Sequence, residues 1–157
     1  MTERSVAHAT FTIQRRYPAA PAAVFKAFAD PAARRRWFVD GEGWTIDAFE
    51  PAFAEGGREL SRFRFGDGPP MRNDTSYHEI VPDERILFSY AMTVDGRRMS
   101  VSLVTIVLAA EAAGTRLTYT EQCVFLDGAD TPAEREAGCR DLLDALATEL
   151  ARPGKDA

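Results

Sequence analysis

Cysteine and histidine are scarce in this chain. Two cysteines, Cys123 and Cys139, and two histidines occur in 157 residues. So few cysteines exclude a disulfide-based scaffold and are typical of free thiols in a reducing cytoplasm. The sequence contains no Cys-x-x-Cys, no His-x-x-x-His, no calcium-loop spacing and no glycine-rich phosphate loop. It therefore predicts neither a metal site nor a cofactor.

Positive charge and long apolar runs are also in short supply. The chain carries 19 Lys and Arg against 24 Asp and Glu, a net charge of −5. Nucleic acids and anionic membranes attract an excess of basic residues, so neither partner is expected. Polar residues follow Met1, and no apolar run reaches the length of a membrane span. We expect a cytoplasmic protein that is a monomer or a weak homodimer.

The composition is that of an ordinary globular protein. Hydrophobic residues make up 45% and charged residues 27% of the chain. A chain of this length has room for one substantial core. We expect a single domain over residues 8–151, with flexible tails over 1–7 and 152–157.

The middle of the chain predicts a succession of strands without helices. Apolar and polar residues alternate with a period of two, and turn signals such as Asp95-Gly96 separate the alternating stretches. Short strands joined by tight turns predict an antiparallel meander. The expected strands cover residues 46–50, 58–65, 75–81, 86–92, 99–108 and 115–125, and a further strand over 11–17 precedes them.

Helices are expected on both sides of this block. Pro21 suits the first turn of a short helix, and Asp30-Pro31 begins a second one that ends near Phe38. Near the end, 131–134 reads as a capping box. An apolar stripe at helical spacing follows, formed by Cys139, Leu142, Leu143, Leu146 and Leu150. This last helix, about 30 Å long, must bury its stripe against the sheet, and the space that it leaves unfilled predicts an internal cavity.

Several motifs, together with this order of elements, resemble one known superfamily. Six motifs carry the resemblance: residues 20–28 followed by Asp30-Pro31 and Trp37; Gly56-Gly57-Arg58; residues 79–80 followed by 82–86; residues 114–118; residues 120–122; and residues 135–138 followed by 142–144. The pattern resembles the START-like (SRPBCC, Bet v 1-like) superfamily, and most of all its bacterial homologues of the activator of heat-shock protein 90 ATPase. The match spans residues 11–150.

The resemblance implies a helix-grip fold of the α+β class. In that fold a curved antiparallel sheet of about six to seven strands wraps around a long C-terminal helix, with two short helices after the first strand. The superfamily includes lipid carriers, polyketide cyclases, hormone receptors and chaperone activators. Because one fold serves many activities, the resemblance does not choose among them.

The leading interpretation is binding of a small hydrophobic or aromatic molecule in the cavity, by a carrier, sensor or sequestering protein. Rings with polar tips and pliable methionines suit such a pocket. The expected lining is Trp37, Phe63, Tyr77, Phe88, Tyr90, Met99, Tyr119, Glu121, Cys139 and Leu143. A single bulge would turn Phe63, Tyr77 or Phe88 to the other face of the sheet.

Glu121 is the main candidate for chemistry. In an apolar cavity its pKa should rise, and it could then bind a ligand hydroxyl or act as a general base. A structural hydrogen bond, for example with Arg15, is the favoured alternative. An enzymatic hypothesis pairs Glu121 with Tyr119 or Tyr90 in a cyclase, dehydratase or hydrolase. A third hypothesis, docking to a chaperone, predicts an exposed apolar patch and little cavity.

Other candidates have simpler interpretations. His78 has no ordered Ser, Cys or Asp partner in the sequence, which favours a surface role over catalysis. Cys123 and Cys139 are expected to pack as small apolar residues. The run 34–36 of three arginines is interpreted as a solvated helix face, with contact to an anionic head group or an acidic partner as the alternative.

Overall fold

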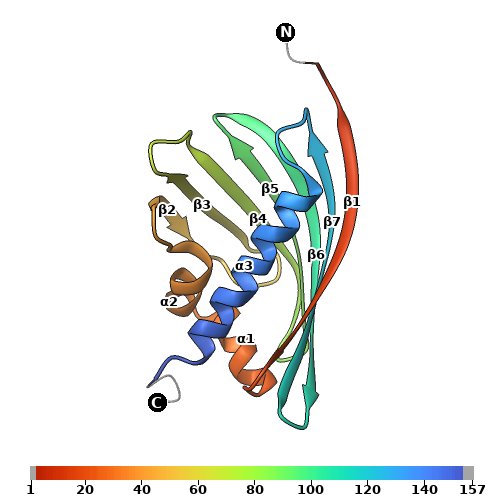
Figure 1. The fold of residues 1–157 in the computed structure, drawn as a ribbon. Coiled ribbons are helices and arrows are strands. Elements are labelled where there is room, and N and C mark those ends of the chain that lie inside the picture. Colours follow the sequence, from red (N-terminus) through yellow and green to blue (C-terminus); the bar gives the residue numbers. More distant parts are fainter. Residues whose placement is uncertain (1–2, 154–157) are drawn as a thin grey trace.

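Seven antiparallel strands form one curved sheet in the computed structural model, which describes residues 3–153 (Figure 1). The strands are β1 (Val6–Tyr17), β2 (Trp44–Glu50), β3 (Arg58–Phe65), β4 (Met71–Val81), β5 (Arg85–Val94), β6 (Arg97–Glu111) and β7 (Gly114–Leu126). Their order across the sheet is β1-β7-β6-β5-β4-β3-β2. The meander is therefore continuous from β2 to β7, and β1 returns to pair with the last strand.

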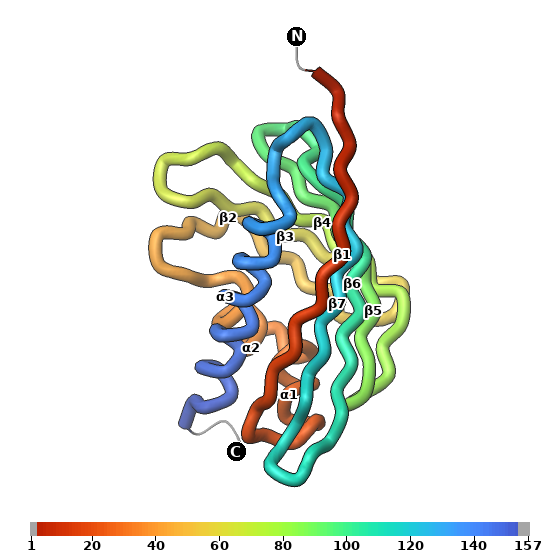
Figure 2. The backbone as a smooth tube through the Cα atoms, turned by 45° about the vertical axis from the view of Figure 1, so that its right-hand side comes forward, coloured from red at the N-terminus to blue at the C-terminus, as the bar shows by residue number. Residues whose placement is uncertain are grey.

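The helices lie on the concave side of this sheet. The first two, α1 (Pro21–Ala29) and α2 (Pro31–Arg34), follow β1, and a single π-helical stretch, η1 (Arg35–Val39), continues α2. The long helix α3 (Pro132–Leu150) crosses in front of the sheet, and the turned view shows the strands curving around it (Figures 1 and 2). The predicted helix-grip arrangement is confirmed.

The local signals in the sequence explain where several elements begin and turn. The Asp30 side chain accepts a hydrogen bond from the backbone N–H of Ala32, and the Thr131 hydroxyl accepts one from that of Glu134. Both residues therefore act as the predicted N-caps. In the β5–β6 hairpin, Asp95 and Gly96 have φ angles of 49° and 76°. A two-residue hairpin of this type needs positive φ at both positions, so the predicted turn is confirmed.

The strands are longer than the alternation of residues indicates. β1 begins at Val6 rather than residue 11, β4 begins at Met71, and β6 continues to Glu111. The added residues of β1 pair with the last residues of β7, from Gln122 to Leu126, so ladder hydrogen bonds hold them without a buried side chain. Parts of the expected tails, residues 1–2 and 154–157, lie outside the described residues.

A bulge fixes which strand residues face the core. The register of β4 against β5 shifts between Tyr77 and Glu79, so His78 has no partner in the ladder. Tyr77 consequently points inward and is buried, while His78 is exposed. The core continues from these strands to α1 and α3, where Val24, Leu143 and Leu146 pack on the sheet.

Leu146→Ala should lower the free energy of unfolding by about 2–5 kcal/mol, since the side chain is 0% exposed and its loss leaves a cavity. The measurement is urea unfolding followed by circular dichroism. Val107→Ala is the control, because Val107 lies on the outer face and is 42% exposed; it should cost well below about 1 kcal/mol. Equal effects of the two changes would contradict the packing of α3 on the sheet.

Candidate functional site

A cavity of about 590 Å³ lies between α3 and the concave face of the sheet. Its wall comes from α1, α2 and η1, from the start of β2, from the inner faces of β3 to β7, and from one side of α3. Most lining side chains are aromatic or aliphatic. Pockets for small organic ligands span about 300–1,000 Å³ and have this kind of lining. The space is therefore large enough for a molecule of several rings.

All but one of the expected lining residues lie in the wall of this cavity. The members of the expected set that line it are Trp37, Phe63, Tyr77, Phe88, Tyr90, Met99, Tyr119, Cys139 and Leu143. The side chains whose direction depended on register, Phe63, Tyr77 and Phe88, all point inward. Glu121 is the exception and does not line the cavity.

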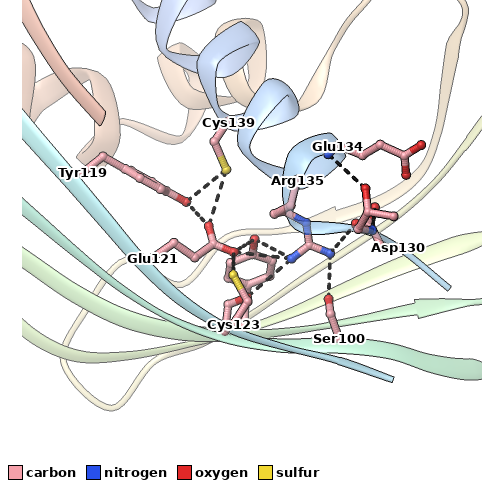
Figure 3. A network of polar contacts seen from close by, with 11 residues as sticks. Ser100, Tyr119, Glu121, Cys123, Asp130, Glu134, Arg135 and Cys139 are labelled. Atoms are coloured by element: carbon pink, nitrogen blue, oxygen red, sulfur yellow. Dashed lines mark hydrogen bonds and ion pairs between the residues drawn. The ribbon is translucent and has the colours of Figure 1, made fainter. Parts of the chain in front are cut away.

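Glu121 lies behind the wall, beneath two tyrosines. It is 0% exposed, and its oxygens accept hydrogen bonds from the hydroxyl of Tyr119 at 2.6 Å and from that of Tyr90 at 2.7 Å. The thiols of Cys123 and Cys139 each lie 3.4 Å from the same carboxylate (Figure 3). Because Tyr90 and Tyr119 face the cavity, their rings separate Glu121 from any ligand.

The charge partner of Glu121 is Arg135, in the first turn of α3. An Arg135 Nη1 atom lies 3.4 Å from Glu121 Oε2 and donates to the Tyr90 hydroxyl at 3.0 Å. The other terminal nitrogen donates to Ser100 at 2.7 Å and to Asp130 at 3.0 Å (Figure 3). The expected hydrogen bond with Arg15 is wrong: Arg15 lies 3.5 Å from Asp144 instead.

The expected rise in the pKa of Glu121 is also wrong. Burial raises this pKa, but hydrogen bonds from Tyr119, Tyr90 and Ser102 and the charge of Arg135 outweigh burial and lower it. Burial and the neighbouring negative charge raise the pKa of Tyr90 and Tyr119 well above the usual value. A carboxylate held in this way is a weak base, and the tyrosines that cover it are weak acids.

The two thiols near Glu121 are unreactive for a related reason. Burial, reinforced by the charge of Glu121, raises the pKa of Cys123 to about 11 and that of Cys139 to about 12. The thiolate is the nucleophilic form of cysteine, so neither residue is activated near neutral pH.

A second buried polar cluster joins α2 to β3 and β4. The Arg34 side chain, only 4% exposed, forms an ion pair with Glu59 and donates to the Tyr77 hydroxyl. Tyr77 in turn donates to Glu59 at 3.3 Å. The guanidinium lies 5.6 Å from the ring centres of Phe38 and of Phe49, within the range of cation–π attraction.

The interpretation of the three arginines as a solvated face is therefore wrong for Arg34. Its two neighbours do lie nearer the surface: Arg35 contacts Asp40 at 3.4 Å, and Arg36 contacts Glu149 at 2.9 Å. Arg34 ends α2, whereas Arg35 and Arg36 belong to η1. Successive helical side chains point about 100° apart, so Arg34 can face the sheet while its two neighbours do not.

Arg135 and Glu59 were not predicted as site residues, although the sequence holds a signal for each. Arg135 precedes Cys139 by four positions, so the apolar stripe of α3 reaches it when extended by one turn. Glu59 precedes Ser61 and Phe63 with a period of two, on the inward face of β3. A charged residue on an otherwise inward face requires a buried partner.

The remaining candidates lie apart from the cavity. His78 is exposed, and its Nε2 atom lies 2.7 Å from the Ser89 hydroxyl on the outer side of the sheet. Within residues 3–153, no group of three or more His, Cys, Asp or Glu side chains is arranged to hold a metal ion. The helices of the same stretch include none with the length and apolar character needed to span a membrane.

Comparisons with known proteins identify relatives over almost the whole chain. The family model described as "Activator of Hsp90 ATPase homolog 1-like protein" matches residues 18–152. The crystal structure of the Mll3558 protein from Rhizobium loti is 53% identical, covers 92% of this chain and 99% of its own, and superposes with a TM-score of 0.86. A protein from Rhizobium leguminosarum is 38% identical over 95% of this chain and 98% of its own, with a TM-score of 0.90.

More distant structures share the fold alone. DynU16, a protein of the dynemicin biosynthetic locus, is 24% identical over 90% of this chain and 46% of its own, with a TM-score of 0.65. A search of curated proteins finds no match.

Arg135→Met should lower the free energy of unfolding by about 3–5 kcal/mol at pH 7, because it leaves the Glu121 carboxylate buried without its cation. In the unaltered protein, folding lowers the pKa of Glu121. The ionised carboxylate therefore adds to the free energy of unfolding at pH values above its pKa in the unfolded chain, and this contribution is lost as the pH falls. In the variant this pKa should be raised, so protonation relieves the penalty. The loss of unfolding free energy caused by Arg135→Met should therefore become smaller as the pH falls from about 7 to about 4.

Chemical unfolding at several pH values measures this effect. Arg140→Met is the matched control, since Arg140 forms an exposed ion pair with Glu136 on the same helix, and it should cost under about 1 kcal/mol. If the loss of unfolding free energy caused by Arg135→Met is the same at every pH, then Arg135 does not stabilise the ionised Glu121 carboxylate.

Proposed function

We propose that this chain, which belongs to the family of Activator of Hsp90 ATPase homolog 1-like proteins in the START-like superfamily, binds a small hydrophobic or aromatic molecule in its internal cavity. The role is that of a carrier, sensor or sequestering protein. The observation that carries the proposal is the 590 Å³ space and its largely apolar wall. Burial of a ligand's apolar surface there supplies about 25 cal/mol per Å² before the costs of association.

The ring arrangement of the wall supports an aromatic ligand. Tyr77 and Phe88 lie 5.8 Å apart between ring centres and are tilted by 56°, and Phe88 lies 6.3 Å from Tyr90. These tilted rings on β4 and β5 present both faces and edges to the cavity. Flat ligands are stabilised by offset or edge contacts of this kind.

Two buried ion pairs hold the wall in place. Arg34 and Glu59 form one buried pair, and Arg135 and Glu121 form another, each bridged by a tyrosine hydroxyl. These ion pairs position the side chains without a ligand. The wall is therefore preformed, and apolar contact and shape account for most of the affinity.

The enzymatic alternative has less support from this geometry. It needs a base within hydrogen-bond reach of the ligand, and Glu121 is covered by Tyr90 and Tyr119. The lowered pKa of Glu121 weakens it further as a base. Docking to a chaperone predicts little cavity, so the observed space favours ligand binding over that hypothesis as well.

Gly138→Phe should block ligand binding and leave the fold intact. Gly138 lines the cavity from α3, and a Cβ atom added there meets nothing within 4 Å. A phenylalanyl side chain can therefore extend into the open space without displacing the wall. Titration with the neutral fluorescent probe N-phenyl-1-naphthylamine should show binding at least about tenfold weaker than in the unaltered protein, the equivalent of about 1.4 kcal/mol.

Gly138→Ala is the matched control. It should keep the affinity and raise the free energy of unfolding by about 0.5–1 kcal/mol, because glycine is unfavourable inside a helix. Equal affinity in the phenylalanine variant, or no binding by the unaltered protein, would refute the proposal. Native mass spectrometry of freshly purified protein provides a second test, through a co-purified small molecule.

A further inference from the structure

We propose further that the cavity takes hydrophobic ligands that carry an oxygen acceptor, from a ketone or a carboxylate, and that Arg34 and Ser61 donate hydrogen bonds to this oxygen. The inference rests on the proposed binding function and specifies the class of ligand. Its basis is a buried polar patch in one part of the wall, which holds hydrogen-bond donors without partners among residues 3–153. The polar patch consists of Arg34, Glu59, Ser61, Asn73 and Thr75.

The register of β3 against β4 brings the polar patch together. Glu59 lies opposite Thr75, and Ser61 lies opposite Asn73. Alternate residues of a strand share one face, so these four side chains form one block on the inner face of the sheet. All four line the cavity, and Arg34 joins the block from α2 through its ion pair with Glu59.

Arg34 is buried in this wall with a donor to spare. Its Nη1 atom donates to the Tyr77 hydroxyl, and its Nη2 atom lies against Glu59 in the ion pair. Neither Nε nor Nη2 makes a hydrogen bond within the described part of the chain, and Nε has no ion-pair partner there either. A buried donor without an acceptor costs free energy, and a ligand oxygen at this place would offset that cost.

Ser61 is a second buried donor on the same section of wall. Its side chain is 8% exposed and lines the cavity, and its hydroxyl has no hydrogen-bond partner among the residues that the structure describes. Buried hydroxyl groups in proteins nearly always have a partner. Since the cavity is the space in front of Ser61, the matching group is one that a ligand brings.

The open groups of the polar patch are donors, whereas its acceptors are occupied. The Thr75 hydroxyl donates to Asn73 Oδ1 at 2.9 Å, so the amide oxygen has a partner while the amide nitrogen has none in the described chain. The Glu59 carboxylate accepts from the N–H of Ala52 at 3.1 Å and from the hydroxyl of Tyr77 at 3.3 Å. The ligand group that complements this patch is therefore an acceptor.

The second buried arginine of the wall lacks such a surplus at its terminal nitrogens. Arg135 Nη1 donates to Tyr90, and Nη2 donates to Ser100 and Asp130. The ligand oxygen is therefore expected at the polar patch.

Aromatic rings adjoin the polar patch on the same inner face. Phe63 follows Ser61 by two positions on β3, and the ring of Tyr77 lies 5.8 Å from that of Phe88. All of these rings line the cavity. A flat apolar body against the rings, with an oxygen at the end that reaches the polar patch, fits both parts of the wall.

The test compares three naphthalenes of similar size: 2-acetylnaphthalene, 2-naphthoate and 2-ethylnaphthalene. Their affinities are measured at neutral pH by displacement of N-phenyl-1-naphthylamine. The hydrocarbon is the most apolar of the three and would bind best to a wall without free donors, because an unpaired polar group is costly to bury. With the donors of the polar patch, the ketone, the carboxylate or both should instead bind at least about threefold tighter than the hydrocarbon. The tighter of the two oxygen compounds shows whether the acceptor is neutral or ionised.

Ser61→Ala should weaken binding of the tighter oxygen compound by about fivefold and leave binding of 2-ethylnaphthalene unchanged. The change removes one donor and breaks no hydrogen bond of the described chain, so the fold should be kept. Arg34→Lys keeps a cation beside Glu59 but removes the Nε donor, and it should weaken the same compound by a similar factor. Ser89→Ala is the matched control, since Ser89 lies on the outer side of the sheet, and it should keep all three affinities. Urea unfolding of each variant confirms that it is folded.

Two results would overturn the acceptor at the polar patch. One is a hydrocarbon affinity equal to or above that of both oxygen compounds. The other is a preference for the oxygen compound that is the same in Ser61→Ala and Arg34→Lys as in the unaltered protein. In either case, binding of the naphthalenes would still uphold the cavity function. If neither the fluorescent probe nor any of the three compounds binds, both proposals are refuted.

Discussion

The packing of α3 across the concave face of the sheet is the constraint on which the rest of the structure depends. At its first turn, Arg135 reaches through the wall to Glu121 on β7. Two turns later and beyond, Leu143 and Leu146 are buried in the core, and the hydroxyl of Tyr17 donates to the backbone oxygen of Leu143 at 2.9 Å. The helix is straight and the sheet is curved, so contact at these places leaves the space near β3 to β6 open. The cavity follows from this difference in shape.

Both buried ion pairs repeat one arrangement: an arginine from a helix, a carboxylate from a strand and a tyrosine hydroxyl that touches both. Arg34, Tyr77 and Glu59 form the first, and Arg135, Tyr90 and Glu121 form the second. Desolvation offsets much of the attraction in such pairs, so their main effect is to specify geometry rather than to add stability. They fix the helices that flank the cavity at the distance that keeps it open.

The sequence predicted what depends on local patterns. Alternation gave the meander, the caps at Asp30 and Thr131 gave the helix starts, and the aromatic residues expected in the cavity face it. It did not predict that Glu121 lies behind the wall, because a period of two gives the face of a sheet but not the depth of a side chain. The partners of Arg34 and Arg135 were missed because each is on another element, and no local pattern encodes such a pairing.

The position of one carboxylate is the main support for a container over a catalyst. Had Glu121 faced the open space with a raised pKa, the same tyrosines would have formed an acid–base pair around a ligand. Instead, four hydrogen-bonding or charged neighbours stabilise its ionised form, and the covering tyrosines hold their protons more tightly than usual. The groups able to exchange protons are thereby committed to the wall, and the rings are left to meet the ligand. A wall whose acid and base groups are held in this way favours binding over turnover.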